Sequence, residues 1–173
     1  MTSIFREDHD MFRDVARRFI DKEIVPHLEQ WESDGIVPKD VWLKAGEVGL
    51  LCSSVEEQYG GAGGDYGHSA VMIEELARVN ATAIGFTTHS EIVANYIVAY
   101  GSEEQKQKWL PGMVSGEIIG VLGLSEPSIG SDLRSMRTQF KRDGDDYIVS
   151  GQKTFITNGG NADLVITGGK IDV

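Results

Sequence analysis

The spacing of apolar residues changes character near residue 117, and this change constrains the fold more than any other feature of the chain. Before it, apolar residues recur three and four positions apart, which places them on one face of an amphipathic helix. This spacing predicts helices over residues 11–24, 69–79 and 92–100, and a shorter helix that begins after Pro38. The first part of the chain is therefore predicted to be all-helical.

After Gly116 the apolar residues fall in short extended runs, which are typical of strands. These runs cover residues 118–124, 138–141, 147–150, 154–156 and 164–167. Asp143-Gly144 lies between two of them and favours a tight hairpin, because glycine tolerates the positive φ that such turns require. We predict an α+β chain, with an all-helical domain over residues 1–116 and the start of an antiparallel β domain over residues 117–173.

Helix ends and helix faces give more detailed expectations. Residues 102–105 read SEEQ, a capping box that predicts the start of one more helix. We expect Pro111 and Gly112 to end that helix. The apolar faces predict that a set of side chains is largely buried, namely Phe19, Ile20, Ile73, Leu76 and Tyr96.

Composition excludes several classes of partner. A formal net charge of −11 repels nucleic-acid backbones and anionic membrane surfaces, so we expect no nucleic-acid binding. The longest apolar runs are too short for a membrane span. The single cysteine, Cys52, cannot form an internal disulfide, and the first residues lack the basic-then-apolar layout of a signal peptide. We therefore expect a cytoplasmic location.

Two segments carry the strongest chemical signals. Residues 122–132 read LGLSEPSIGSD and leave a strand for a turn rich in serine and glycine. Such a turn can aim backbone N–H groups and the hydroxyls of Ser125 and Ser131 at an anion or a ring edge. Turns of this composition are common as plain strand-to-turn connections, so the residues alone favour that interpretation and do not decide between the two. Residues 143–159 read DGDDYIVSGQKTFITNG and form the second segment.

Together the two segments resemble the paired signature of the acyl-CoA dehydrogenases. The glycine loop at residues 59–64 and the segments 49–51, 74–77 and 100–106 are similar to the helical domain of that family. The resemblance covers the chain to about residue 167 and is closest to long-chain-type members. It implies FAD as the cofactor and an acyl-CoA as the substrate, which is oxidised to a trans-2-enoyl-CoA.

The resemblance also implies which residues contact the flavin. The matching positions are Leu122, Leu124, Ser125, Phe155, Ile156 and Thr157. Among them, Phe155 matches a side chain that packs near the ring, and Thr157 matches one that donates a hydrogen bond to it. Donors near N5 and O4 would stabilise the electron-rich, reduced ring. Ser125 stands where the family usually has threonine, a change that keeps the hydroxyl.

Three further residues are substrate candidates. Ser131 matches a position at the cofactor pyrophosphate and at the pantetheine arm of the thioester. Thr88 and His89 line the acyl channel by resemblance, although the threonines and the serine of this stretch could equally serve as helix N-caps. In the family, Ser128-Ile129 is usually a Gly-Ala pair, and the added bulk here lies where the backbone approaches the cofactor.

The resemblance places the catalytic base in a C-terminal four-helix bundle that this chain does not contain, so no residue is assigned as catalytic. The β domain is expected to be a truncated antiparallel β-barrel, and the chain alone to be inactive. Glu126 is interpreted as a structural carboxylate that accepts hydrogen bonds from nearby backbone N–H groups. Scattered histidines predict no metal site, and His9 is expected to be solvated.

The resemblance implies two partners besides substrate: electron-transfer flavoprotein as electron acceptor, and further copies of the chain in a homotetramer. Two alternatives stay open. An acyl-CoA oxidase would share the same motifs, differing in how the reduced flavin meets oxygen. A non-catalytic binding or assembly module would need no base at all.

Overall fold

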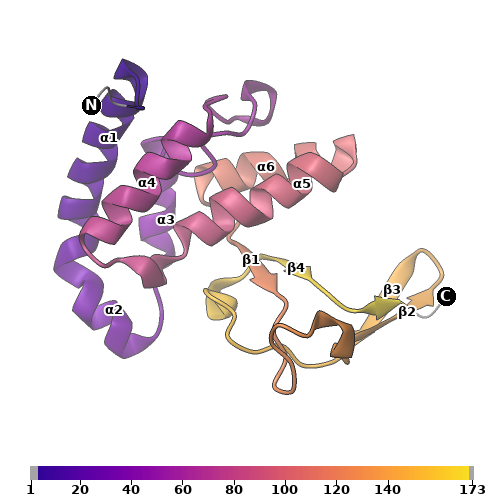
Figure 1. Ribbon diagram of the computed structural model, residues 1–173. Coiled ribbons are helices and arrows are strands. Elements are labelled where there is room, and N and C mark those ends of the chain that lie inside the picture. Colours follow the sequence, from indigo (N-terminus) through magenta and orange to yellow (C-terminus); the bar gives the residue numbers. More distant parts are fainter. Residues whose placement is uncertain (1–3, 172–173) are drawn as a thin grey trace.

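The computed structural model describes residues 4–171, so both outer ends of the predicted domains, residues 1–3 and 172–173, lie outside the description. Six α-helices form one cluster, and the chain then passes into two small sheets below and beside it (Figure 1). The helices are α1 (Glu7–Phe19), α2 (Leu28–Asp34), α3 (Lys39–Glu47), α4 (Tyr66–Arg78), α5 (Ala94–Tyr100) and α6 (Glu103–Ser115). None of the helices within this range has the length and apolar character to cross a bilayer.

The predicted helices are all present, with two π-helical extensions. The turn η1 (Ile20–Ile24) continues α1, and η5 (Thr88–Val93) leads into α5. The capping box is confirmed, because the Ser102 hydroxyl accepts from the Gln105 N–H and the Gln105 side chain accepts from the Ser102 N–H. Helix α2 was not expected, and Gly35 ends it in a left-handed conformation.

The predicted end of α6 at Pro111 and Gly112 is wrong. The helix continues through both residues and ends at Gly116, which has a φ of +79° and donates its N–H to the Met113 carbonyl. A proline removes only one donor from a helix, whereas a left-handed glycine redirects the chain and caps the last carbonyls. The left-handed glycine is therefore the signal that decides this end.

The strands form two sheets that are only partly antiparallel. They are β1 (Gly120–Gly123), β2 (Gln139–Asp143), β3 (Asp146–Ser150), β4 (Leu164–Thr167) and β5 (Lys170–Ile171). The β2–β3 hairpin is antiparallel as predicted, with Asp143 opposite Asp146 and Gly144 at a φ of +64°. The pairs β1–β4 and β2–β5 are parallel, and the described residues close no barrel. Parallel pairing is possible in both cases because a long stretch of chain connects the two strands, whereas a tight turn would make them antiparallel.

Residues 154–156 do not form the predicted strand. The N–H of Thr154 donates to the Ser125 carbonyl at 3.0 Å, and Phe155 has a φ of +55°, outside the extended region. The left-handed conformation of Phe155 prevents residues 154–156 from forming the regular hydrogen bonds of a strand. Lys170–Ile171, in contrast, pairs with β2 although its sequence gave no strand signal.

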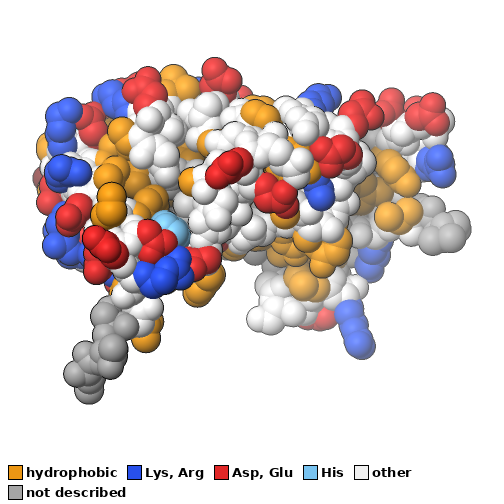
Figure 2. Space-filling view, turned by 90° about the horizontal axis from the view of Figure 1, so that it is seen from above, with side chains coloured by type: hydrophobic (Ala, Val, Ile, Leu, Met, Phe, Trp, Pro, Cys, Tyr) orange, Lys and Arg blue, Asp and Glu red, His pale blue; other side chains and the backbone are white. Residues whose placement is uncertain are grey.

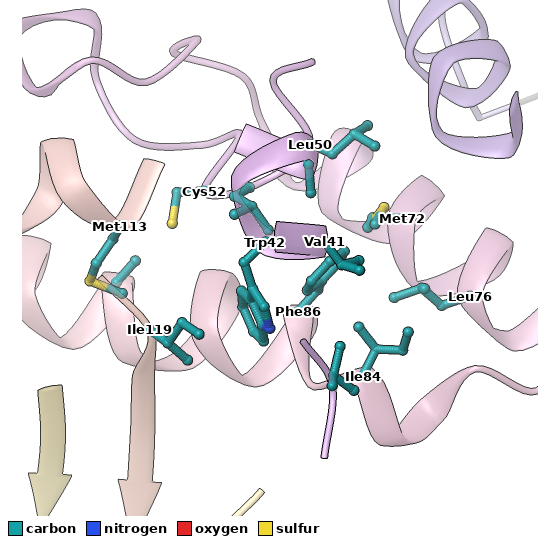
Figure 3. Packing of buried hydrophobic residues seen from close by; sticks show 14 of the residues in the cluster. Val41, Trp42, Leu50, Cys52, Met72, Leu76, Ile84, Phe86, Met113 and Ile119 are labelled. Atoms are coloured by element: carbon teal, nitrogen blue, oxygen red, sulfur yellow. The ribbon is translucent and has the colours of Figure 1, made fainter. Parts of the chain in front are cut away.

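The core of the helical cluster centres on Trp42, which is fully buried (Figure 3). Its ring meets Phe86 edge-on, with 4.6 Å between ring centroids, and lies 5.2 Å from the His89 ring. Ile119 and Val121, which follow the last helix, are buried in the same cluster. The division into domains at residue 116 stays a prediction, because the core extends across it.

Two of the five predicted core residues are misplaced. Phe19, Ile20 and Leu76 are buried as expected, but Ile73 is 41% exposed and Tyr96 is 44% exposed. On α4 the buried stripe instead runs through Ser69, Val71, Met72, Glu75 and Leu76. Ile73 falls on the opposite face because a polar residue, Glu75, takes a place in the interior.

Glu75 joins α1 to α4 through a cluster of three arginines. Its carboxylate is buried and accepts from Arg17 at 2.8 and 2.9 Å, from Arg13 at 3.1 Å and from Arg78 at 3.0 Å. Hydrogen bonds from the arginines, that of Arg17 foremost, lower the pKa of this carboxyl to about 2. The charge is thus paired inside the fold rather than left unsatisfied.

Charged side chains cover the outside of the helical cluster. Figure 2 shows acidic groups scattered over this face, with basic groups interspersed among them. The distribution agrees with the excess of acidic residues in the sequence, 27 against 16 basic ones.

Candidate functional site

The structure brings the two signature segments side by side. Leu122 lies in β1, and the chain leaves this strand through Leu124 and Ser125. The backbone N–H of Thr154 donates to the Ser125 carbonyl at 3.0 Å, and the ammonium of Lys153 donates to the Leu124 carbonyl at 3.1 Å. The predicted flavin-contacting residues therefore lie on two adjoining segments, although about 30 positions of sequence separate them.

Phe155 stands out in this region because its side chain is 93% exposed. An aromatic side chain this exposed has a ring face free to stack beside another aromatic ring. Its left-handed backbone is uncommon for a bulky residue, and such conformations concentrate at functional sites. The geometry at Phe155 thus fits a flavin contact.

Ile156 and Thr157 line a cavity of about 370 Å³ between the helical cluster and the loop. Its apolar walls include Trp31 and Ile84, and Ile156 packs against the core. The next residue, Asn158, donates its side-chain N–H to the Ile84 carbonyl at 2.9 Å and anchors the loop to the helical cluster.

Ser131 lies apart from these contacts. Its side chain is exposed, in the connection between the turn at Glu126–Ile129 and the short 3₁₀ turn at Leu133–Ser135. The structure places it on the same loop as Ser125, and its assignment to the pyrophosphate stays a prediction. The bulky Ile129 closes a tight turn with Glu126 through two backbone hydrogen bonds.

Thr88 and His89 lie in the π-helical turn η5, beside β1. Thr88 is half-buried, whereas the His89 ring is fully buried and both of its nitrogens have backbone partners. The Gly120 N–H donates to Nδ1 at 3.0 Å, and Nε2 donates to the Met113 carbonyl at 3.0 Å. His89 therefore offers no free ring nitrogen to a ligand, and a role at the acyl channel would be one of packing.

The buried His89 makes a clear pH prediction. Burial lowers the pKa of this imidazole from 6.5 to about 4, so the fold favours the neutral ring. As the pH falls, the His89 imidazole gains its proton in the unfolded chain before it does so in the folded protein. The contribution of the neutral His89 to the unfolding free energy is therefore fully present above pH 6.5 and is lost as the pH falls toward 4. We expect a loss of about 3 kcal/mol in unfolding free energy over this range.

Denaturant titrations at stepped pH measure this effect. His89→Gln should remove most of the slope between pH 6.5 and 4. His27→Gln, a change at an exposed histidine, should keep it. Equal slopes in the two variants would contradict the assignment to His89.

A cluster of histidines and carboxylates lies outside this region, at the start of α1 and α4. One possible ligand atom each from Asp8, His9 and His68 lie within 4.8 Å of one another, a proximity that their sequence positions did not indicate. The expectation that His9 is solvated is wrong, because it is 3% exposed. Its Nδ1 accepts from the Arg6 N–H at 3.1 Å, and its Nε2 lies 2.8 Å from an Asp65 oxygen.

These contacts already satisfy the groups in the cluster. Arg6 donates to Asp8 and to Asp65, each at 2.7 Å, and both nitrogens of His9 are engaged. A cation would have to displace the guanidinium and the cap of α1. The cluster is therefore a hydrogen-bonded contact that joins the start of α1 to the start of α4. The absence of a metal site stays a prediction.

Glu126 has the structural role expected of it. The carboxylate accepts from the N–H groups of Arg137 at 2.7 Å and Thr138 at 2.9 Å, and from the Thr138 hydroxyl. Lys153 donates to it at 3.0 Å. These bonds, first among them that of the Thr138 hydroxyl, lower the pKa of Glu126 to about 2. The carboxylate is thus held ionised and fully engaged, which makes it a poor proton acceptor.

The two signature segments thus lie together beside the helical cluster, with Phe155 and Thr157 exposed to solvent. A family model described as the acyl-CoA dehydrogenase N-terminal domain matches residues 6–117. A second, described as the acyl-CoA dehydrogenase middle domain, matches residues 121–170. The chain belongs to the acyl-CoA dehydrogenase family, whose cofactor is FAD.

Individual relatives agree with this assignment. The long-chain specific acyl-CoA dehydrogenase of mouse mitochondria is 48% identical over 163 residues, which are 94% of this chain and 38% of the mouse protein. An acyl-CoA dehydrogenase from Geobacillus kaustophilus superposes with a TM-score of 0.92 at 49% identity, covering 96% of this chain and 44% of that one.

A third relative is an acyl-CoA dehydrogenase from Bacillus anthracis complexed with FAD. It has a TM-score of 0.90 and 36% identity, over 98% of this chain and 30% of that one. The chain thus spans less than half the length of each of these relatives.

Sequence reasoning found the segments of this site but missed the contacts that join them. Lys153 carried no signal of its own, because lysines in polar stretches are ordinarily solvent-exposed. Its position inside the second signature segment was the available clue. Asn158 was likewise inconspicuous, although its side chain spans two parts of the fold that are far apart in sequence.

Proposed function

We propose that this chain supplies the flavin-contacting part of an FAD-dependent acyl-CoA dehydrogenase that acts on medium-to-long fatty acyl thioesters. The observation that carries the proposal is the exposed, left-handed Phe155 on a loop tied to the Leu124–Ser125 segment. Membership of the family and the likeness to a long-chain relative support the cofactor and the substrate class.

Each residue has a proposed task. Phe155 packs against the flavin ring, and the hydroxyls of Ser125 and Thr157 donate to its edge. The backbone at Leu122 and Leu124 and the side chain of Ile156 complete the contact, and Ser131 binds the pyrophosphate and the pantetheine arm. Thr88 and His89 shape the acyl channel.

The chemistry that bound FAD would supply is the acceptance of a hydride from the β-carbon of the acyl thioester. The residues of this chain hold and orient the ring, and their hydroxyl donors stabilise charge that develops at its edge. Glu126 cannot remove the α-proton, because its carboxylate is held by the Arg137 and Thr138 donors and by Lys153. A general base contributes about 10²–10⁴-fold, so we propose that these 173 residues alone do not sustain the reaction.

The same family membership supports the proposed partners. Electron-transfer flavoprotein would accept the electrons, and the complete enzyme would be a homotetramer. A cytoplasmic location is also part of the proposal, supported by a single cysteine that is buried and unpaired.

The proposal is tested by titrating FAD into the purified chain and measuring the quenching of flavin fluorescence. We expect measurable but weak binding by the wild type. Phe155→Ala should weaken it about tenfold, a loss of stacking of roughly 1.4 kcal/mol. The melting temperature should hardly change, because the side chain is exposed.

Tyr147→Ala is the matched control, since Tyr147 is another exposed aromatic, on the β2–β3 hairpin. It should bind FAD as the wild type does. The proposal fails if the wild type binds no FAD, or if Phe155→Ala and Tyr147→Ala bind it equally well.

A further inference from the structure

We propose that Glu126 and Lys153 are positioning residues, an ion pair that fixes the spacing between the two flavin-contacting segments. The inference rests on the proposed function, because it concerns how this chain presents its own groups to the flavin ring. Neither residue contacts the ring in this proposal. Each acts through the residues beside it, Ser125 on one segment and Phe155 on the other.

The first observation is that both charges of the pair are withdrawn from water. Glu126 is 4% exposed, and the Lys153 side chain is 11% exposed. The remaining members of the two segments are mostly half-buried or exposed. Buried charge is unfavourable unless it is paired and hydrogen-bonded, and a buried ion pair is by itself weak evidence for a stabilising role.

The second observation is where the lysine ammonium lies. It donates to a Glu126 carboxylate oxygen at 3.0 Å and to the Leu124 carbonyl at 3.1 Å. These two acceptors belong to the residues directly before and after Ser125. The ammonium therefore holds the backbone just before the predicted hydroxyl donor and the side chain of the residue just after it, from a residue only two positions before Phe155.

The third observation is that Glu126 ties this arrangement to the sheet. Its carboxylate accepts from the N–H groups of Arg137 and Thr138, directly before β2 begins at Gln139. The Thr138 carbonyl in turn accepts from the Lys170 N–H at 2.8 Å, in β5. Glu126 thus connects the loop to a hydrogen-bonded sheet.

The far end of the Phe155 segment is anchored separately. Asn158 donates to the Ile84 carbonyl at 2.9 Å, and its backbone is left-handed with a φ of +59°. A Cβ on the adjacent Gly85 would meet the Asn158 amide and the Thr157 methyl at 2.3 and 2.7 Å, so the approach depends on glycine. Lys153 and Asn158 therefore hold the two ends of a short segment whose central residue, Phe155, projects outward.

The two anchors explain how an uncommon backbone persists in an exposed loop. Left-handed conformations at non-glycine residues are kept only where surrounding contacts over-determine them. Without the lysine anchor the segment could relax, and the hydroxyls of Ser125 and Thr157 would lose their fixed separation. The predicted consequence is an altered environment for the flavin ring rather than a general loss of fold.

The experiment compares FAD binding and the visible absorption spectrum of the bound flavin in four variants of the full chain. Lys153→Met keeps the length of the side chain and removes its charge. It should weaken FAD binding about tenfold and shift the absorption band, because the hydrogen bonds at the ring edge change. Glu126→Gln, a change of similar size, should shift the band in the same direction.

Glu75→Gln is the matched control, since it also removes a buried carboxylate paired with basic side chains, but one in the helical cluster, where the partners are arginines. It should lower stability and leave the spectrum unchanged. In the double variant of Glu126 and Lys153, the loss of affinity should be smaller than the product of the two single effects, because they break the same contact.

Circular dichroism establishes which variants are folded before FAD is added. An unchanged affinity and spectrum in folded Lys153→Met would overturn the proposal while leaving the proposed function intact. Unfolding of both Lys153→Met and Glu126→Gln would also overturn it, because the pair would then be structural only. Failure of the wild type to bind FAD would instead contradict the proposed function itself.

Discussion

Replacing Trp42 with alanine is expected to lower the unfolding free energy by about 4 kcal/mol, and the melting temperature by roughly 10 °C. Trp42 is fully buried, and its ring contacts Phe86 at the centre of the helical cluster (Figure 3). The same ring contacts the buried His89 imidazole. The surrounding helices can close only part of the space left by an indole. Denaturant titration followed by circular dichroism measures the change.

Two tryptophan variants separate the cavity from other effects. Trp109→Ala removes the same side chain at a half-buried position and should cost no more than about 2 kcal/mol. Trp42→Phe should also be mild, because within residues 4–171 the indole N–H has no hydrogen-bond partner to lose. A loss in Trp42→Ala no larger than that in Trp109→Ala would contradict the central position given to Trp42.

Glu75→Gln is the second substitution with a large expected effect, a loss of about 3 kcal/mol in unfolding free energy. The change leaves Arg13, Arg17 and Arg78 facing a neutral amide that cannot accept from all three. Thermal or denaturant unfolding of the purified chain measures it. The buried position of the carboxylate makes the loss larger than for an ordinary surface ion pair.

Glu74→Gln is the matched control on the neighbouring residue. Glu74 pairs with Arg13 at 2.8 Å, but its side chain is 54% exposed, so we expect a cost of at most about 1 kcal/mol. The wild type should also lose stability as the pH falls from 4.5 to about 2, where the Glu75 carboxylate gains its proton. Glu75→Gln should lack that part of the acid slope, and an unchanged slope would contradict the assignment.

The parts of the fold that the sequence predicted well are those set by local signals. The helical stripes, the capping box at Ser102 and the glycine hairpin at Asp143-Gly144 each depend on residues a few positions apart. The errors arise where distant parts of the chain decide. Ile73 lies on the outer face because Glu75 turns inward to three arginines, two of them on α1. Thr154 is drawn out of a strand by the Ser125 carbonyl.

The candidate site shows the same division. The residues of the two segments could be named from their resemblance to a family, because that signal is written in consecutive positions. The ion pair between Glu126 and Lys153 could not be predicted, since 27 positions separate the two residues and both types are ordinarily solvent-exposed. The burial of His89 could not be predicted from the sequence either, because its hydrogen-bond partners lie far along the chain, on α6 and β1.

The way β1 enters the helical core bears on how such proteins can be recombined. Ile119 and Val121 fill space among the helices, and the Gly120 N–H completes the hydrogen bonding of a buried imidazole. In a chimera joined at residue 117, where the first family match ends, residues 119 and 121 would come from the second parent protein and would have to pack against helices of the first. The hydrogen bond from residue 120 to the His89 imidazole would then also depend on the second parent's backbone. A junction after Gly123 keeps β1 with the helices that it packs against. The segment that should be exchanged as one piece is therefore longer than the segment that the first family model matches.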